Sequence, residues 1–291
     1  GELTTAEIVS LLEQLAGLGV LRLTLTGGEP AVREDLLEIA AEARRLRFAL
    51  VLKTSAVLFN GDDIEALRRA GVVELHASIY HPSAEHHDRF VGRNGAWRRA
   101  VAALDRFRAL GGVARANTPV MAWNVEALPE LVSMYEEHGW DYAVDPRIVA
   151  REDDCAEPRG LRVSDSALDG LLRDGRITAP HASPRAPQAP VCSVGRGGAY
   201  ITAQGDVMPC PNLPLVFGNV RELPFARIWR ESPERQRVLR LTWGDSPQCA
   251  QCAESPHCMR CPGDAFTEHG DMRIPSSLDC RMGRAIGRVR G

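Results

Sequence analysis

Cysteine is missing from the first half of this 291-residue chain, because the first of its eight cysteines is Cys155. An excess of either charge is also missing, since the formal net charge is -3, and this excludes an electrostatic argument for nucleic acid or an anionic membrane as partner. No run approaches the ~20 apolar residues that span a bilayer. The start, GELTTAEIVS, has no initiator Met and none of the basic or apolar segments of a signal peptide. We therefore expect a cytoplasmic protein, in which CxxC pairs bind metal more often than they form disulfides.

The first half contains alternating strand-like and helix-like segments. Apolar β-type runs predict five strands at residues 21–26, 48–55, 72–80, 113–120 and 141–148. Segments with helical apolar spacing predict helices at 5–19, 35–47, 62–71, 97–112 and 125–140. This alternation predicts βαβ units and a parallel sheet. Because the chain enters on a helix, we expect a leading strand and its loop to lie before residue 1.

The second half follows a different pattern. Four prolines among residues 178–190 are typical of a linker over the surface. We therefore expect a first domain at 1–150, a linking segment at 151–190 and a small domain at 191–291. Residues 199–210 predict a β-hairpin around Gly205, and residues 225–241 predict a short amphipathic helix. We expect the remaining cysteine-rich part to have little regular structure and to depend on metal for its folding energy.

The segment TGGEP, residues 26–30, is the most informative stretch of the first half. Gly27 and Gly28 allow a sharp turn and a close approach of backbone to ligand. Glu29 places a carboxylate at the carboxyl end of a strand, where parallel sheets bind ligands, and Pro30 removes one donor and stiffens the turn. A carboxylate beside exposed carbonyls suits a ligand with an ammonium group. An ordinary strand-to-helix turn with a solvated Glu fits the same pattern.

LTLTGGEPAVREDL, residues 23–36, resembles the second strand and following loop of radical S-adenosylmethionine (SAM) enzymes. The resemblance implies an α/β fold, a partial (β/α)6 TIM-like barrel without its first strand, in which GGEP binds the amino group of SAM. Other pieces of the family occur in the same order, at residues 52–56, 76–97 and 114–124. They imply further SAM contacts, and the implied cofactor-binding set is Gly27, Gly28, Glu29, Pro30, Thr54, Ser55, Ser78 and Asn117. Each of the last four also fits a strand residue satisfied by backbone.

One defining feature of that family does not occur in residues 1–291, namely the CxxxCxxC loop that holds the SAM-binding 4Fe–4S cluster. In the family this loop follows the first strand, so we expect it upstream of Gly1. A degenerate relative that never had the cluster is the alternative. We expect this stretch alone not to cleave SAM and the full-length protein to do so.

The cysteines of the second half are clustered. Cys249, Cys252, Cys258 and Cys261 form two CxxC pairs, which fit a zinc ribbon as well as an iron–sulfur site. Cys192, Cys210 and Cys280 flank them, so that seven clustered cysteines are one short of two four-ligand sites.

The order of these cysteines, together with FGNVRELPFARIW at 217–229, is similar to the SPASM extension of radical SAM enzymes, which holds two auxiliary 4Fe–4S clusters. One spacing departs, because two residues rather than the common three separate Cys258 from Cys261. The resemblance implies one cluster on Cys192, Cys210 and Cys261 and another on Cys249, Cys252, Cys258 and Cys280. The fourth ligand of the first cluster is then Cys155, a substrate, or an open iron site.

Three other polar groups have alternative interpretations. The sequence His86-His87-Asp88 is expected to be a cap or turn rather than a metal site. Arg147 fits either a peptide carboxylate or a structural ion pair, and Asp206 fits either an acid–base group near a cluster or a hairpin turn. No catalytic protein residue is predicted, because in this chemistry the protein mainly positions the reactants.

Residues 142–165 resemble maturases of ribosomally made peptides (RiPP maturases), which install thioether or carbon–carbon cross-links. The resemblance implies a peptide-modifying oxidoreductase that uses SAM, two auxiliary 4Fe–4S clusters and a third, SAM-binding cluster in the full-length protein. It also implies a precursor peptide as substrate and a flavodoxin or ferredoxin as reductant, with neither nucleic acid nor membrane as partner. The alternatives are a formylglycine-forming sulfatase maturase, a haem-precursor-modifying enzyme and, from another class, a non-catalytic zinc-binding scaffold.

Overall fold

The computed structural model describes residues 1–149, 157–177 and 185–290. The chain divides into two compact units, Gly1–Val120 with Asn124–Asp145, and Met121–Trp123 with Pro146–Gly291. The domain boundaries predicted at residues 150 and 190 stay predictions. Across the described ranges, no helix combines the length and apolar character that a membrane crossing requires.

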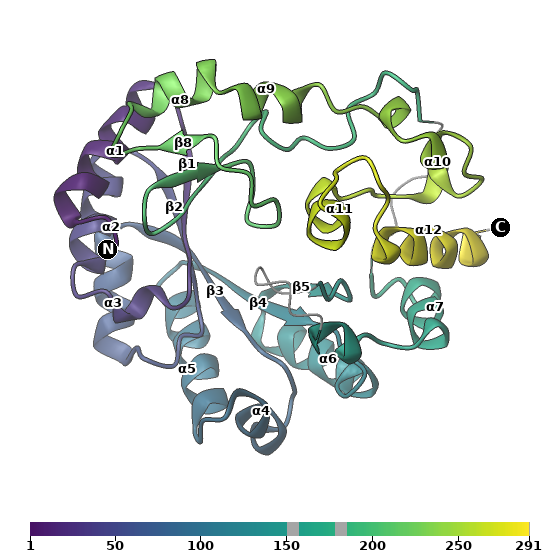
Figure 1. The fold of residues 1–291 in the computed structure, drawn as a ribbon. Helices are drawn as coiled ribbons and strands as arrows, with labels where there is room; N and C mark the ends of the chain where they lie inside the picture. Colours follow the sequence, from purple (N-terminus) through teal and green to yellow (C-terminus); the bar gives the residue numbers. More distant parts are fainter. Residues whose placement is uncertain (150–156, 178–184, 291) are drawn as a thin grey trace. The chain divides into compact units, whose positions relative to one another are not determined.

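The first unit is built on a parallel sheet of five strands in chain order (Figure 1). The strands are β1 (Arg22–Leu25), β2 (Ala49–Thr54), β3 (Val72–Ser78), β4 (Val113–Pro119) and β5 (Asp141–Asp145). All four neighbouring pairs are parallel. The predicted α/β fold with a parallel sheet is therefore confirmed, and all five carboxyl ends of the strands point to the same edge.

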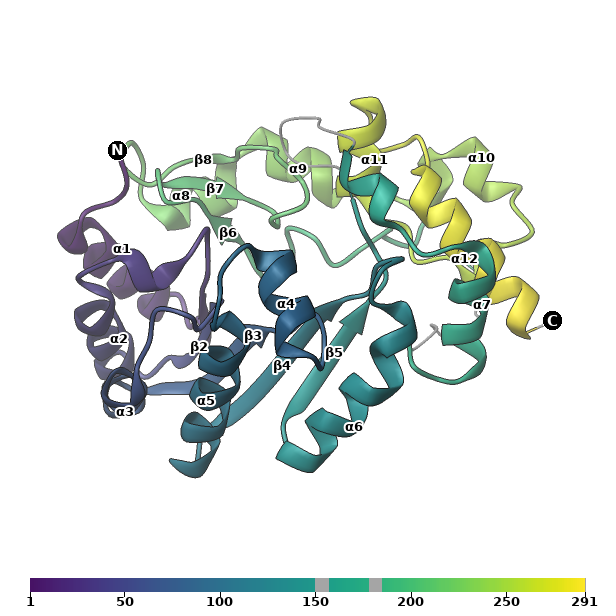
Figure 2. The same ribbon diagram turned by 90° about the horizontal axis from the view of Figure 1, so that it is seen from below.

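The predicted helices of this unit are present as α1 (Thr5–Gly17), α2 (Leu36–Arg45), α3 (Gly61–Ala70), α5 (Ala96–Ala109) and α6 (Leu128–His138). Figure 2 shows α2, α3 and α5 along one side of β2, β3 and β4. The buried core forms there, because Leu50, Leu52 and Leu75 of the strands and Phe107 of α5 are fully enclosed. Short 3-10 turns precede α2 and α6 at Pro30–Val32 and Val125–Ala127.

A further helix, α4 (Ala84–Val91), was not predicted. It contains His86, His87 and Asp88, so the interpretation of these residues as a turn is wrong. For Asp88 the interpretation as a cap is confirmed, because its carboxylate accepts hydrogen bonds from the backbone N–H groups of Gly95 and Trp97 at the start of α5.

The second unit contains a small sheet, and its first two strands form the predicted hairpin. Strands β6 (Tyr200–Ile201) and β7 (Asp206–Met208) pair antiparallel around Gly205, and β8 (Gly218–Asn219) adds to β7. The Asn219 side chain donates to Asp206 at 2.9 Å and to the Gln204 carbonyl at 3.1 Å. Asp206 is thus part of the hairpin's own hydrogen bonding, which favours its predicted turn role.

The prediction of a single helix at 225–241 is wrong, because the chain forms two helices there, α8 (Phe225–Glu231) and α9 (Pro233–Leu239). Pro233 has no N–H to continue the first helix, and the Ser232 hydroxyl accepts from the Arg235 N–H to start the second.

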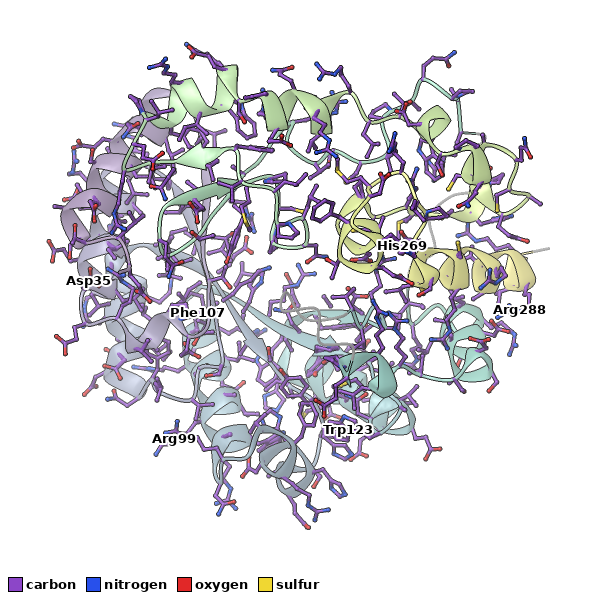
Figure 3. The ribbon with its side chains drawn as sticks, in the orientation of Figure 1. Asp35, Arg99, Phe107, Trp123, His269 and Arg288 are labelled. Carbon is purple, nitrogen blue, oxygen red and sulfur yellow. The ribbon has the colours of Figure 1, made fainter. Side chains whose placement is uncertain are left out.

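The expectation of little regular structure after residue 241 is also wrong. Helices α10 (Pro247–Ala250), α11 (Pro262–His269) and α12 (Ser277–Arg290) occur there, with 3-10 turns at Trp243–Asp245 and Ser255–His257. Helix α12 packs on α7 (Asp165–Arg173), which follows a 3-10 turn at Glu157–Leu161. Arg288, labelled in Figure 3, extends from α12 to pair with Asp169 of α7 at 2.7 Å. Tertiary packing of apolar faces therefore stabilises helices that the polar, Arg-rich sequence did not reveal.

Candidate functional site

Glu29 is a hydrogen-bonding centre at the end of β1. Its Oε1 accepts from the Thr54 hydroxyl and from the Ala31 N–H at 3.1 Å. Its Oε2 accepts from the Ser55 hydroxyl and from the Ser55 N–H at 2.8 Å. Burial by itself would raise the pKa of Glu29, but the bonds from Ser55, Thr54 and Ala31 outweigh it and hold the pKa below its ordinary value. The structure thus brings together three predicted site residues, Glu29, Thr54 and Ser55, around one ionised carboxylate.

The two glycines before Glu29 are exposed at the same edge. Gly27 has φ 144°, a backbone conformation that a residue with a Cβ rarely adopts. Within the described part of the chain, the carbonyls of Gly27 and Gly28 accept no hydrogen bond. A carboxylate occupied by four donors, next to two open carbonyls, can attract an ammonium group by charge while the carbonyls accept its hydrogen bonds.

Ser78 and Asn117 lie on neighbouring strands. They are register partners near the carboxyl ends of β3 and β4, and both are partly exposed. The preceding register row pairs Thr54 of β2 with Ala77 of β3. All the predicted SAM-contacting residues therefore lie along one edge of one sheet.

The face of this sheet that carries Ser78 also carries a group of ionisable side chains that the sequence motifs did not predict. His76 Nε2 lies 3.0 Å from Glu74 Oε2, which also pairs with Arg22 at 2.8 Å. Burial lowers the pKa of His76, opposed by its bond to Glu74. The signal was present in VVELHAS, where Glu74, His76 and Ser78 alternate with apolar residues.

A cavity of about 60 Å³ in the second unit gathers four cysteines, Cys249, Cys252, Cys258 and Cys280. They come from α10, the turn after it, the segment after the 3-10 turn at 255–257, and α12. Among the residues that the structure describes, no three His, Cys, Asp or Glu side chains meet as ligands of a single metal ion. What the chain offers here is a cavity lined by thiols.

Burial also affects the protonation of two of these thiols, Cys258 and Cys280. It raises the pKa of Cys258 to about 12, with added contributions from Asp279 and the neighbouring cysteines. It likewise raises the pKa of Cys280, although Arg284 opposes the shift. Thiolate ligation at this site must therefore displace protons, so that metal uptake releases acid.

The other predicted ligands gather separately. Cys192 is near enough to Cys210 to add to the rise in pKa that burial causes there. Cys261 caps α11 and accepts from the Asp264 N–H at 3.5 Å. At Gly263, a Cβ would lie 2.3 Å from the Asn212 carbonyl oxygen, so the start of α11 lies directly against the turn that begins at Cys210. Cys261 does not line the cavity of the other four cysteines, and Cys155 lies outside the described residues.

Arg147 connects these two groups of cysteines. Its guanidinium donates to Asp264 on α11 and, at 2.7 Å, to Asp279 on α12. Asp279 Oδ2 accepts in turn from the Cys261 N–H at 2.8 Å. Burial lowers the pKa of Arg147, but its attraction to Asp279 and Asp264 and the hydrogen bonds that it donates to them raise the pKa above its ordinary value. Of the two predicted roles for Arg147, the structure supports the structural ion pair.

Arg260 provides a test of whether the thiol cavity fits an anionic metal group. It lines the cavity and is 3% exposed. Its Nη2 donates to the Met272 carbonyl, but Nε and Nη1 have no partner among the described residues. A buried guanidinium with two unsatisfied donors is costly unless a negative group accepts from it. Four thiolates around an iron–sulfur core carry net negative charge, so the residues present fit that group.

Comparison with known sequences shows to which protein family the chain belongs. Residues 1–134 match the model of the Radical SAM superfamily, and residues 192–262 match that of SPASM, an iron–sulfur cluster-binding domain. The chain is 30% identical to the AdoMet-dependent heme synthase of Methanosarcina barkeri over 93% of this chain and 85% of that protein. The chain belongs to the radical SAM superfamily and carries a SPASM domain. Both domains imply SAM and iron–sulfur clusters as cofactors.

Individual relatives extend this similarity. The chain is 31% identical to the PqqA peptide cyclase of Gluconobacter oxydans over 86% of this chain and 74% of that protein. The fold is similar to Streptococcus suis SuiB bound to S-adenosylmethionine, with TM-score 0.73 and 17% identity over 94% of this chain and 69% of that chain. It is also similar to anSMEcpe with bound AdoMet and Cp18Cys peptide, with TM-score 0.71 and 13% identity over 99% of this chain and 89% of that chain. The predicted radical SAM fold is confirmed.

Proposed function

We propose that this protein is a radical SAM peptide maturase, which removes a hydrogen atom from a ribosomal peptide and forms a thioether or carbon–carbon cross-link. The observation that carries the proposal is the 31% identity to a PqqA peptide cyclase, which covers 86% of this chain and 74% of that protein. The fold is also that of SuiB, whose structure bound to the precursor peptide SuiA matches with TM-score 0.69.

The residues at the sheet edge have distinct roles in this proposal. The carbonyls of Gly27 and Gly28 accept from the ammonium of SAM, and the ionised Glu29 stabilises its positive charge. Pro30 is buried and holds the turn, while Thr54 and Ser55 orient Glu29. Ser78 and Asn117 contact SAM from the next two strands. SAM, once bound and reductively cleaved, supplies the 5′-deoxyadenosyl radical that takes the hydrogen atom.

The cysteines hold two auxiliary 4Fe–4S clusters in this proposal. Cys249, Cys252, Cys258 and Cys280 hold one, and their common cavity supports this set. Cys192, Cys210 and Cys261 hold the other, whose fourth position is left to Cys155 or to substrate. Clusters held by these cysteines would supply a binding site for substrate or an acceptor for the electron that remains after cross-linking. Residues 1–291 contain no CxxxCxxC for a third, SAM-binding cluster, so the proposed activity also needs residues outside this range.

Haem-precursor chemistry is the second candidate. It is favoured by the 30% identity to an AdoMet-dependent heme synthase, which covers more of this chain than the peptide cyclase does. The two candidates share the cofactors and differ in substrate.

The test measures 5′-deoxyadenosine and substrate mass together. The whole protein, as encoded by its gene, is reconstituted anaerobically with iron and sulfide and reduced in the presence of SAM. It receives either any short peptide that is encoded beside its gene or a porphyrin precursor. We expect 5′-deoxyadenosine to form with peptide, and the peptide to lose the mass of two hydrogen atoms.

Two other outcomes would redirect the proposal. Product formed only with the porphyrin precursor would favour the second candidate. Zinc in place of iron and sulfide in the purified protein would contradict both candidates.

A Cys252→Ser variant is the matched control for the role of the auxiliary clusters. Cys252 is exposed, so its loss leaves the buried core intact.

A further inference from the structure

Arg260 is the least compensated buried charge in the thiol-lined cavity. Only its Nη2 has an acceptor, the Met272 carbonyl, while Nε and Nη1 donate to nothing within the described ranges. Arg260 is only 3% exposed, so bulk solvent has little access to these donors. A buried donor that stays unpaired destabilises the fold, because it has lost its hydrogen bonds to water without gaining others.

Within the described ranges, no carboxylate accepts a hydrogen bond from Arg260. Asp245 is close enough for attraction, but its carboxylate accepts from Thr242. Asp279 lines the same cavity and accepts from Arg147 and from the Cys261 N–H. Glu254 also lines the cavity and makes no ion pair with Arg260. The free donors of Arg260 are thus available to whatever the four cysteines hold.

We infer that Arg260 contacts the auxiliary cluster held by Cys249, Cys252, Cys258 and Cys280, donating from Nε and Nη1 to its sulfur atoms. The inference rests on the proposed function, because it assumes an iron–sulfur group in this cavity. The geometry places a fixed positive charge and two donors beside a group of net negative charge.

This contact has two measurable consequences. Hydrogen bonds to the sulfurs and a nearby positive charge favour the reduced, more negative cluster, so Arg260 raises its reduction potential. In the metal-free chain the same guanidinium is a buried charge with two donors that find no acceptor among the described residues. Its removal should therefore leave the metal-free chain equally stable or more stable, and should weaken only the loaded chain.

The experiment compares Arg260→Met and Arg260→Lys with wild type in the whole chain, each metal-free and reconstituted with iron and sulfide. Arg230→Met is the matched control, because Arg230 is an exposed arginine on α8. Midpoint potentials are measured by EPR-monitored titration, iron retention by chelator challenge, and stability by thermal unfolding.

We expect a lower midpoint potential for Arg260→Met, a smaller decrease for Arg260→Lys and no change for Arg230→Met. Reconstituted Arg260→Met should lose iron to the chelator several-fold faster, while the metal-free variant melts no lower than metal-free wild type.

The contrary results are distinct. If Arg260→Met takes up iron and sulfide normally and its midpoint potential is unchanged, the role of Arg260 is contradicted. The cluster assignment itself is then unaffected. A metal-free Arg260→Met chain that melts lower, or does not fold, assigns Arg260 to packing and overturns the inference. Wild type that takes up no iron and sulfide contradicts the cluster assignment, and the inference with it, before any variant is compared.

Discussion

Glu29 illustrates at the scale of one residue how a motif acquires its function from tertiary partners. The GGEP motif predicts a carboxylate at a strand end, but the donors to that carboxylate come from Thr54 and Ser55, more than twenty residues later. Because four donors occupy its two oxygens, Glu29 contributes charge and geometry to the edge rather than a free acceptor.

Replacing Glu29 by Gln tests this role. The amide nitrogen of Gln would face donors, so we expect the free energy of unfolding at pH 7 to fall by about 1–3 kcal/mol. The pKa of Glu29 is lowered in the fold, so its stabilisation is fully present above the ordinary value of 4.5 and is lost as the pH falls through the folded value. The difference from wild type should therefore shrink in acid.

Urea unfolding at pH 7 and at a pH of about 3 measures this difference. Glu34→Gln is the control, since Glu34 is exposed. A difference that stays constant between the two pH values would contradict the role of the ionised carboxylate.

At the scale of elements, the ion-pair network of Arg147 joins three segments of the second unit. It connects the chain after β5 to α11 through Asp264 and to α12 through Asp279. The side chains of these aspartates are 5% and 1% exposed, so their charges depend on Arg147 for compensation. The elements that carry Cys261 and Cys280 are thereby held in register.

Arg147→Leu removes this compensation. We expect the free energy of unfolding of the second unit to fall by about 3–5 kcal/mol, because two buried carboxylates lose their cation. Arg147→Lys should recover part of the loss, since an ammonium keeps the charge without the guanidinium geometry. Thermal unfolding compares both with Arg173→Leu, a substitution of an exposed arginine on α7. An effect of Arg147→Leu as small as that of the control would contradict the network's role.

At the scale of the whole molecule, the cysteines from Cys249 to Cys261 do not all lie in one place. Three of its cysteines line the cavity with Cys280, while Cys261 lies at the start of α11 against the turn after Cys210. The proposed clusters would then be joined by the short segment between Cys258 and Cys261.

Single substitutions separate the two proposed sites. Cys261→Ala should deplete the cluster shared with Cys192 and Cys210 and leave the other largely intact, and Cys258→Ala should do the reverse. Iron and sulfide content per chain and EPR spectra of the reduced protein measure both effects. Equal loss from both sites in both variants would contradict the separate ligand sets.

The sequence predicted some parts of this protein better than others for physical reasons. The five strands and their helices were predictable, because period-two and helical apolar patterns directly reflect burial on one sheet. Helix α12 was not predictable, because its Arg281 and Arg288 pair with Asp165 and Asp169 of α7, which lie 116 and 119 residues earlier in the chain. The break between α8 and α9 was readable from Pro233 and was missed.

The sequence by itself determined the parallel sheet, the position of GGEP at a strand end and the spacing of the clustered cysteines. Local pattern and chain order are sufficient for these features. Only the tertiary structure decided that Glu29 is held by Thr54 and Ser55, that Arg147 pairs with two aspartates, and that Arg260 lies in the cavity with two free donors. These depend on which side chains meet across the fold, and long-range contacts between polar groups leave no periodic signal in the chain.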